Sequence, residues 1–171
     1  MSFKDELNAN LKTPQQVAQE KESAEVAEAK RNAQYDFEMI KNALKQQVSQ
    51  GQYYDSGSYK QVSATIISSN LLGYCQRTIR QSQEKRGFFG NDIRFYASFT
   101  VSYKNDYIAR EYFKELDKLT KAEGITYEAI AKHERVCFND TFFSIPGSCR
   151  IECFDNSVRN ISVGLRASMK F

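Results

Sequence analysis

The single histidine and the four cysteines are the residues of this chain best suited to bind a metal ion or to act as a nucleophile. His133 stands four positions before Cys137, and Cys149 stands four positions before Cys153. One imidazole and three thiolates form an accepted zinc ligand set. Both pairs fall in predicted strands, however, where four residues separate Cα atoms by about 13 Å, too far for two side chains to share one ion. We therefore expect neither zinc nor another cofactor, and we expect the thiols to be small core residues.

Recognisable catalytic motifs are absent from the sequence. It contains no glycine-rich phosphate-binding loop, no His-Glu-x-x-His metalloprotease motif and no Gly-x-Ser-x-Gly nucleophile elbow. A thiol–imidazole pair such as Cys75 with His133 is the remaining nucleophile and base, since such residues meet in space and not in sequence. With one histidine and three other cysteines competing for that role, we expect a protein that is not an enzyme.

A short stretch at residues 85–91, KRGFFGN, combines basic, aromatic and glycine residues. Residues 86–88 match the first three positions of the octamer with which RNA-recognition-motif domains contact RNA. Residues 89–90 break the next two positions. The interval of roughly 20 residues back to a companion motif at 65–71 is also too short for the helix and strand that this fold places there. The stretch therefore does not make the chain a member of that family.

The same stretch is typical of a hairpin loop. Gly87, Gly90 and Asn91 favour a turn, and a strongly alternating strand begins directly after them. Phe88 and Phe89 would then lie at the tip of the hairpin. Two interpretations remain open, because the rings either fold back under the sheet as core residues or insert into a partner as binding anchors.

Positive charge is concentrated around this stretch. Residues 60–104 contain seven Lys or Arg and two Asp or Glu, a net charge of +5, whereas the whole chain carries +3. Concentrated charge favours an anionic partner, although an ordinary solvated surface accounts for many such runs. The arginines, lysine and phenylalanines of this region are the candidate partner-binding residues: Arg77, Arg80, Lys85, Arg86, Phe88, Phe89 and Arg94.

The N-terminal part of the chain predicts one long helix at residues 14–50. Thr13 and Gln16 form a capping box around Pro14, and no further proline or glycine follows before Gly51. Such a helix is about 55 Å long. That length exceeds what a globule made from the other residues can cover, so the helix projects, pairs with a second copy or breaks.

The apolar pattern of this helix is uneven. From Val26 to Val48 apolar residues follow a spacing of three and four, which predicts that this half packs against the rest of the protein. Before Val26 the stripe is thin, so this half is expected to be exposed or to form a homodimer through the N-terminal helix. Phe3, Leu7 and Leu11 predict a short amphipathic helix ahead of it.

The remaining sequence predicts strands and one helix. The helix is expected at residues 106–124, residues 70–84 have no assignment, and alternating residues predict strands at 61–69, 93–103, 125–138, 149–154 and 158–171. In the last strand the odd-numbered residues, Ile161 to Phe171, are expected to point inward. We therefore expect an α+β fold with a long N-terminal helix and a mostly antiparallel sheet of about four to five strands, covered on one face by helices. The expected division is an N-terminal helical segment, 1–50, and an α+β domain, 51–171.

The N-terminus lacks the features of a secretory signal. Residues 1–16 carry acidic side chains and no apolar run, and no stretch approaches the roughly 20 apolar residues of a membrane span. We expect a cytoplasmic protein without a membrane partner, in which the cysteines are reduced.

These features favour a non-enzymatic binding protein that acts through protein–protein contacts on a protein or ribonucleoprotein complex. Its organisation is typical of the small accessory or inhibitor proteins that phages and mobile elements encode. The alternative is direct binding of DNA or RNA through the basic segment 77–94 and the polar face of the sheet. On that face the candidate residues are Tyr96, Arg166 and Lys170. The two alternatives differ in salt dependence, which is steep when phosphates are neutralised.

Overall fold

Residues 2–86, 88, 92–133, 141–142, 148–153 and 161–171 are described by the computed structural model, with side chains for residues 2–83, 88, 100–131 and 161–171. The helices of this part are α1 (Phe3–Ala9), α2 (Pro14–Ser49), α3 (Ser69–Gly73) and α4 (Asp106–Ala122). The strands are β1 (Tyr54–Asp55), β2 (Lys60–Ile67), β3 (Cys75–Arg86), β4 (Asp92–Tyr103), β5 (Ile125–His133), β6 (Thr141–Phe142), β7 (Ser148–Cys153) and β8 (Ile161–Lys170).

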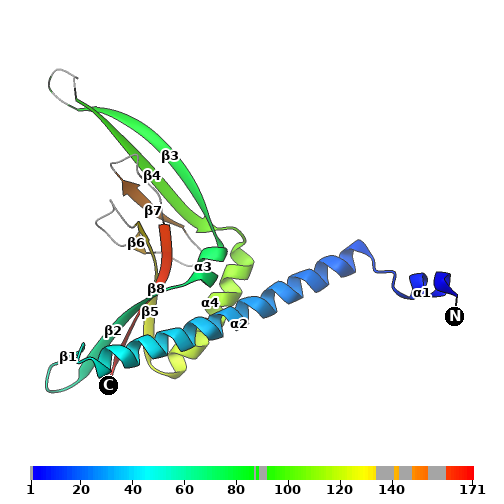
Figure 1. The fold of residues 1–171 in the computed structure, drawn as a ribbon, viewed down its shortest axis with the longest axis horizontal. Coiled ribbons are helices and arrows are strands. Elements are labelled where there is room, and N and C mark those ends of the chain that lie inside the picture. The colour runs from blue at the N-terminus through cyan, green and yellow to red at the C-terminus, as the bar shows by residue number, and fades with distance from the viewer. Residues whose placement is uncertain (1, 87, 89–91, 134–140, 143–147, 154–160) are drawn as a thin grey trace.

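The strands form two antiparallel sheets. The five-stranded sheet has the order β1-β2-β8-β5-β6, and the three-stranded sheet has the order β3-β4-β7. Every pairing described is antiparallel. The last strand of the chain, β8, is therefore central, with β2 on one side and β5 on the other (Figure 1).

Helices cover one face of the five-stranded sheet. α2 packs on β2, β8 and α4, and α4 packs on β5, so that one core lies between the helices and the sheet. On the opposite face Ser63, Thr65, Thr126 and Glu128 are exposed. The predicted α+β class, with a long helix and an antiparallel sheet covered on one face, is confirmed. The three-stranded sheet is an addition that the sequence pattern did not predict.

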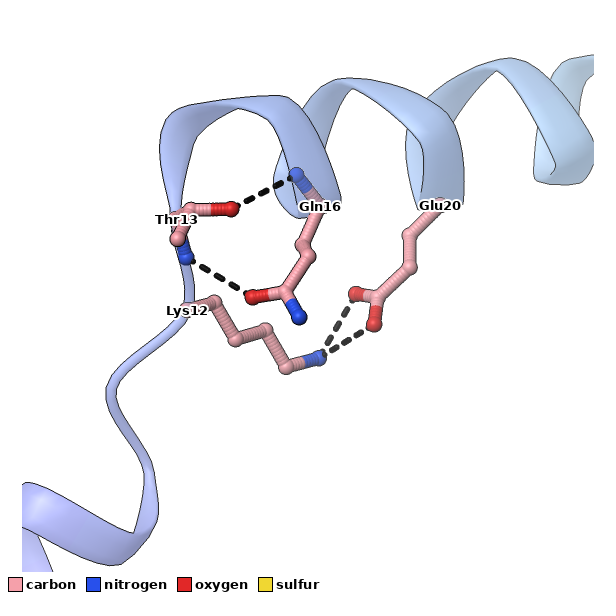
Figure 2. Close-up of polar contacts among 4 residues, drawn as sticks. All are labelled: Lys12, Thr13, Gln16 and Glu20. Atoms are coloured by element: carbon pink, nitrogen blue, oxygen red, sulfur yellow. Dashed lines mark hydrogen bonds and ion pairs between the residues drawn. The ribbon is translucent and has the colours of Figure 1, made fainter.

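The start of α2 is capped as predicted (Figure 2). The Gln16 backbone N–H donates to the Thr13 hydroxyl (3.2 Å), and the Thr13 backbone N–H donates to the Gln16 side-chain oxygen (2.9 Å). Pro14 takes the first helical position, where no backbone donor is required. The Lys12 ammonium also contacts the Glu20 carboxylate at 2.6 Å, so the segment before the helix is tied to its second turn.

The two halves of α2 have different environments, as the apolar pattern predicted. Ala29, Ala33, Phe37, Ile40 and Leu44 are buried in the core, whereas residues 14–24 are all exposed. The exposed half projects from the body of the molecule and carries α1 at its far end (Figure 1). α1 has no buried residue. The core is thus shared across the expected boundary at residue 50.

Deleting residues 1–24 is therefore expected to leave the stability of the protein almost unchanged. The deletion removes no buried side chain among the described residues 2–24, so the thermal midpoint should move by no more than about 3 °C. Circular dichroism on heating measures it. A deletion of residues 1–34 is the control, because it also removes buried Ala29 and Ala33 and should lower the midpoint clearly. A large loss with the shorter deletion would mean that the exposed half stabilises the fold.

Two details of the sequence interpretation change. Residues 70–84, unassigned from sequence, contain most of the one-turn helix α3 and most of β3. Ile161 to Ala167 alternate inward as expected, but Phe171 is 52% exposed. β8 ends at Lys170, and the Phe171 ring lies on the surface, edge-on to Tyr53 at 6.4 Å between ring centroids. Of the predicted strand 125–138, residues 134–138 lie outside the described part.

Candidate functional site

The strands β3 and β4 form a long hairpin, called the arm below. They pair without interruption from Cys75 opposite Tyr103 to Arg86 opposite Asp92. The arm extends away from the body of the molecule (Figure 1). Among the described side chains of the arm, the three that belong to the core lie at its root: Cys75, Val101 and Tyr103. The predicted hairpin on either side of residues 87–91 is confirmed by this pairing.

β3 is an exposed edge strand. In the described part of the chain it pairs with β4 alone, while β7 joins the other side of β4 between Ala97 and Ser102. Residues 76–83 of β3 are exposed at every position, so neither face of the strand is covered. Neighbouring residues of a strand point to opposite faces, and a structural strand normally buries one of them. β3 therefore presents two side-chain faces and a row of backbone groups to its surroundings.

Of the predicted partner-binding residues, those that the structure describes belong to the arm or its tip. Arg77 and Arg80 are exposed on β3, and their odd separation places them on opposite faces. Phe88 is fully exposed, so for this ring the interpretation as a core residue is wrong. Phe89 lies outside the described residues. Lys85, Arg86 and Arg94 occupy register positions in the outer third of the arm.

Opposite charges face each other in this outer third. Glu84 is paired in register with Arg94, and Arg86 is paired with Asp92. Facing residues of opposite charge favour a given register, whereas like charges oppose it. These pairs indicate that part of the positive charge counted in the sequence serves the pairing of the strands. Arg77, Arg80 and Lys85 have no acidic residue opposite them on β4.

A pocket of about 390 Å³ lies at the base of the arm. It is called the basal pocket below. α2, α3 and the junction between β4 and α4 meet there, and its lining consists of Glu25, Glu28, Asn32, Ser69, Asn70, Gly73, Tyr74, Lys104, Asn105 and Ile108. The junction is held together by the backbone, because the Lys104 N–H donates to the Tyr74 carbonyl oxygen (2.8 Å). The Asn105 side chain caps α4 by accepting from the N–H groups of Tyr107 and Ile108.

A buried carboxylate lies behind this pocket. Asp36 is 2% exposed and accepts three hydrogen bonds, from the Ser68 hydroxyl (2.5 Å), the Tyr112 hydroxyl (2.6 Å) and the Asn70 amide (3.1 Å). Among the described side chains, no cation shares an ion pair with it. Because Asn70 both bonds to Asp36 and lines the pocket, it links the pocket wall to this network.

Tyr74 forms the aromatic part of the wall. Its hydroxyl accepts from the Asn32 amide (2.7 Å), and its ring lies 5.6 Å from that of Tyr112. Burial raises the pKa of Tyr74; the hydrogen bond from Asn32 opposes that effect, and the negative charges of Glu28 and Asp36 raise the pKa further. Tyr74 is thus a partly buried phenol in a wall that also carries the Glu28 carboxylate.

The residues of the alternative site do not lie on one sheet face. Arg166 and Lys170 belong to β8 in the five-stranded sheet, whereas Tyr96 belongs to β4 in the three-stranded sheet. The Lys170 ammonium lies over the Tyr59 ring, 4.7 Å from its centroid. The continuous polar face that sequence alternation suggested is therefore divided between two sheets.

The candidate zinc residues fall largely outside the described side chains. His133 ends β5, and Cys149 and Cys153 lie in β7 as predicted, while Cys137 lies outside the described residues. The described side chains contain no group of three His, Cys, Asp or Glu that could hold a metal ion. Cys75 is buried at the root of the arm, where its thiol donates to the Leu71 carbonyl oxygen (3.2 Å).

The basal pocket and Asp36 were missed in the sequence interpretation, although the sequence holds a signal for the latter. Asp36 falls three residues after Ala33 and four before Ile40, within the apolar stripe that packs on the core. A carboxylate at such a position needs hydrogen-bond donors from elsewhere in the fold. The pocket has no comparable signal, because its walls come from three distant segments.

Among the described residues, no helix combines the length and the apolar character that a membrane span requires. Comparison of the chain with protein-family models, with curated proteins and with solved structures found no match.

Proposed function

We propose that this chain is a non-enzymatic binding protein of the cytoplasm that contacts a protein or ribonucleoprotein partner through the arm. The observation that carries the proposal is the exposure of β3, which has no covered face from residue 76 to 83. A ribbon of this length buries little surface in the isolated chain, yet ordering it costs conformational entropy. Contact with a partner would bury the ribbon and so offset that cost.

The arm offers two modes of contact. The outer edge of β3, which pairs with no strand of the described part of the chain, supplies backbone donors and acceptors, to which an extended segment of a partner can add as a further strand. Phe88 at the tip supplies an exposed aromatic ring, a residue class that contributes strongly to binding when a partner buries it. Arg77 and Arg80 add positive charge on both faces of β3, which favours a partner with acidic groups beside the strand.

The triple substitution Arg77→Ala, Arg80→Ala and Phe88→Ala tests this proposal. Because the three side chains are exposed, the free energy of unfolding should change by no more than about 1 kcal/mol. Affinity for the partner should fall by about 2 kcal/mol or more. The partner is first captured from a lysate of the source organism with the wild-type chain and identified by mass spectrometry. Its affinity is then measured with purified components.

A matched control replaces one phenylalanine and two arginines outside the arm. Phe171, Arg31 and Arg110 are exposed, and their replacement by alanine should leave the affinity unchanged. Equal affinity of the arm variant and the wild type would refute the proposal. The alternative, direct binding of nucleic acid, predicts a different result. The chain would bind generic single- or double-stranded DNA or RNA, and the affinity would fall steeply with salt because phosphates are neutralised.

A further inference from the structure

The basal pocket has an excess of acceptors over cations. Glu25 and Glu28 contribute two carboxylates from successive turns of α2, and Lys104 is the one cationic residue among the described residues of the lining. The Lys104 ammonium donates to the Gly73 carbonyl oxygen (3.2 Å). The carboxyl group of Asp36 lies behind the wall, where its three hydrogen-bond donors are neutral. The pocket therefore favours a positively charged ligand.

Two asparagine amides of the pocket wall, those of Asn32 and Asn70, also favour a positively charged ligand. Asn32 donates its amide N–H to Tyr74, and Asn70 donates its amide N–H to Asp36. Each of these bonds fixes the amide by its nitrogen, which leaves the carbonyl oxygen as an acceptor for N–H groups of a ligand. Among the described lining residues, an anion would meet two carboxylates and a single charged donor, Lys104.

The pocket also fits the aliphatic part of such a ligand. Its volume of about 390 Å³ is near the lower end of the range for small-molecule sites, which suits one side chain or one small amine. The Tyr74 ring and Ile108 provide apolar surface for a methylene chain. An aromatic ring beside carboxylates is also a favourable neighbour for an ammonium or guanidinium group.

We propose that the basal pocket binds an organic cation, an ammonium or guanidinium group on a short aliphatic chain, between Glu25, Glu28 and the ring of Tyr74. This proposal does not depend on the proposed contact of the arm, so a result that refutes the arm contact would leave the cation site untouched. Two sources share this chemistry, a free aliphatic polyamine and a lysine or arginine side chain of another protein, and the probes below distinguish them.

Nuclear magnetic resonance titration of the ¹⁵N-labelled full chain tests the proposal. The probes are spermidine, N-acetyl-arginine methylamide, N-acetyl-lysine methylamide and the uncharged analogue N-acetyl-citrulline methylamide. We expect saturable shifts for the charged probes at Gly73, Tyr74 and Ile108 and at the side-chain amides of Asn32 and Asn70. Tighter binding of spermidine identifies a polyamine site, and tighter binding of an amino-acid derivative identifies a side-chain site. Binding of the citrulline analogue with equal affinity, or absence of saturable shifts with every probe, would overturn the proposal.

Charge substitutions with opposite expected effects complete the test. Glu25→Gln combined with Glu28→Gln should weaken binding of the charged probes by about tenfold or more, because charged hydrogen-bond acceptors are lost. Lys104→Gln should strengthen the same binding, since it removes the repelling charge. Glu22→Gln is the matched control on the exposed part of α2 and should change the affinity by less than about twofold. Unchanged affinity in the double variant, or weaker binding in Lys104→Gln, would contradict the assignment.

Discussion

Replacing Asp36 with alanine is expected to lower the free energy of unfolding by about 2–6 kcal/mol, because it leaves two buried hydrogen-bond donors without an acceptor. The substitution leaves the hydroxyls of Ser68 and Tyr112 without their acceptor in the core. Each unsatisfied buried donor costs about 1–3 kcal/mol. The Asn70 amide lies partly at the surface and can turn to water, so it should contribute less.

Denaturant unfolding of matched variants measures this effect. Tyr112→Phe removes one donor and keeps the ring, so it should cost only about 1–3 kcal/mol. Glu38→Ala is the control on the same helix, since this carboxylate is exposed and should matter by no more than about 0.5 kcal/mol. If Asp36→Ala changed the stability as little as Glu38→Ala, the buried carboxylate could not be the acceptor that organises Ser68, Asn70 and Tyr112.

Replacing Gly164 with alanine is expected to cost about 2–3 kcal/mol, within the range for overpacking a tightly packed site. Gly164 lies in the middle of β8, and a Cβ atom there would collide with the backbone carbonyl oxygen of Ile66. The chain leaves β2 at this point and crosses close to β8, where the Ser68 N–H donates to the Val163 carbonyl oxygen (2.9 Å). Because the colliding atom is backbone, it cannot move aside without shifting a strand.

Gly73→Ala is the matched control for this prediction. A Cβ atom at Gly73 meets nothing within 4 Å, and its φ angle is not positive. Gly73 also ends α3, where alanine loses less backbone entropy than glycine on folding, so stability should stay within about 0.5 kcal/mol or rise slightly. Chemical denaturation of the two variants at one protein concentration gives the comparison. Equal and small changes would show that the pairing of β2 with β8 at this point adapts freely.

The segment α3 connects the two candidate sites. Tyr74 directly follows α3 and lines the basal pocket, and Cys75 begins β3 and the arm. Lys104, which follows the other strand of the arm at its root, holds this segment with one backbone and one side-chain hydrogen bond. A ligand in the basal pocket would therefore contact the residues at which both strands of the arm leave the body of the protein.

Local features were determined by the sequence alone. The capping box at Thr13, the proline that follows it and the apolar stripe from Val26 predicted α2 and the half of it that packs, because capping and periodicity act within a few residues. Strand alternation predicted the antiparallel, one-sided sheet for the same reason. The turn residues between Arg86 and Asp92 predicted the hairpin of the arm.

Long-range features were decided only by the tertiary structure. A period of two shows that a segment is a strand but not which strand it joins, so neither the central place of β8 nor the separate sheet of β3, β4 and β7 could be predicted. Asp36 and Tyr112 are 76 residues apart in the chain, and their hydrogen bond exists only because α2 and α4 pack together. The basal pocket likewise exists only where α2, α3 and the start of α4 meet, since each segment supplies one wall and none forms a site alone.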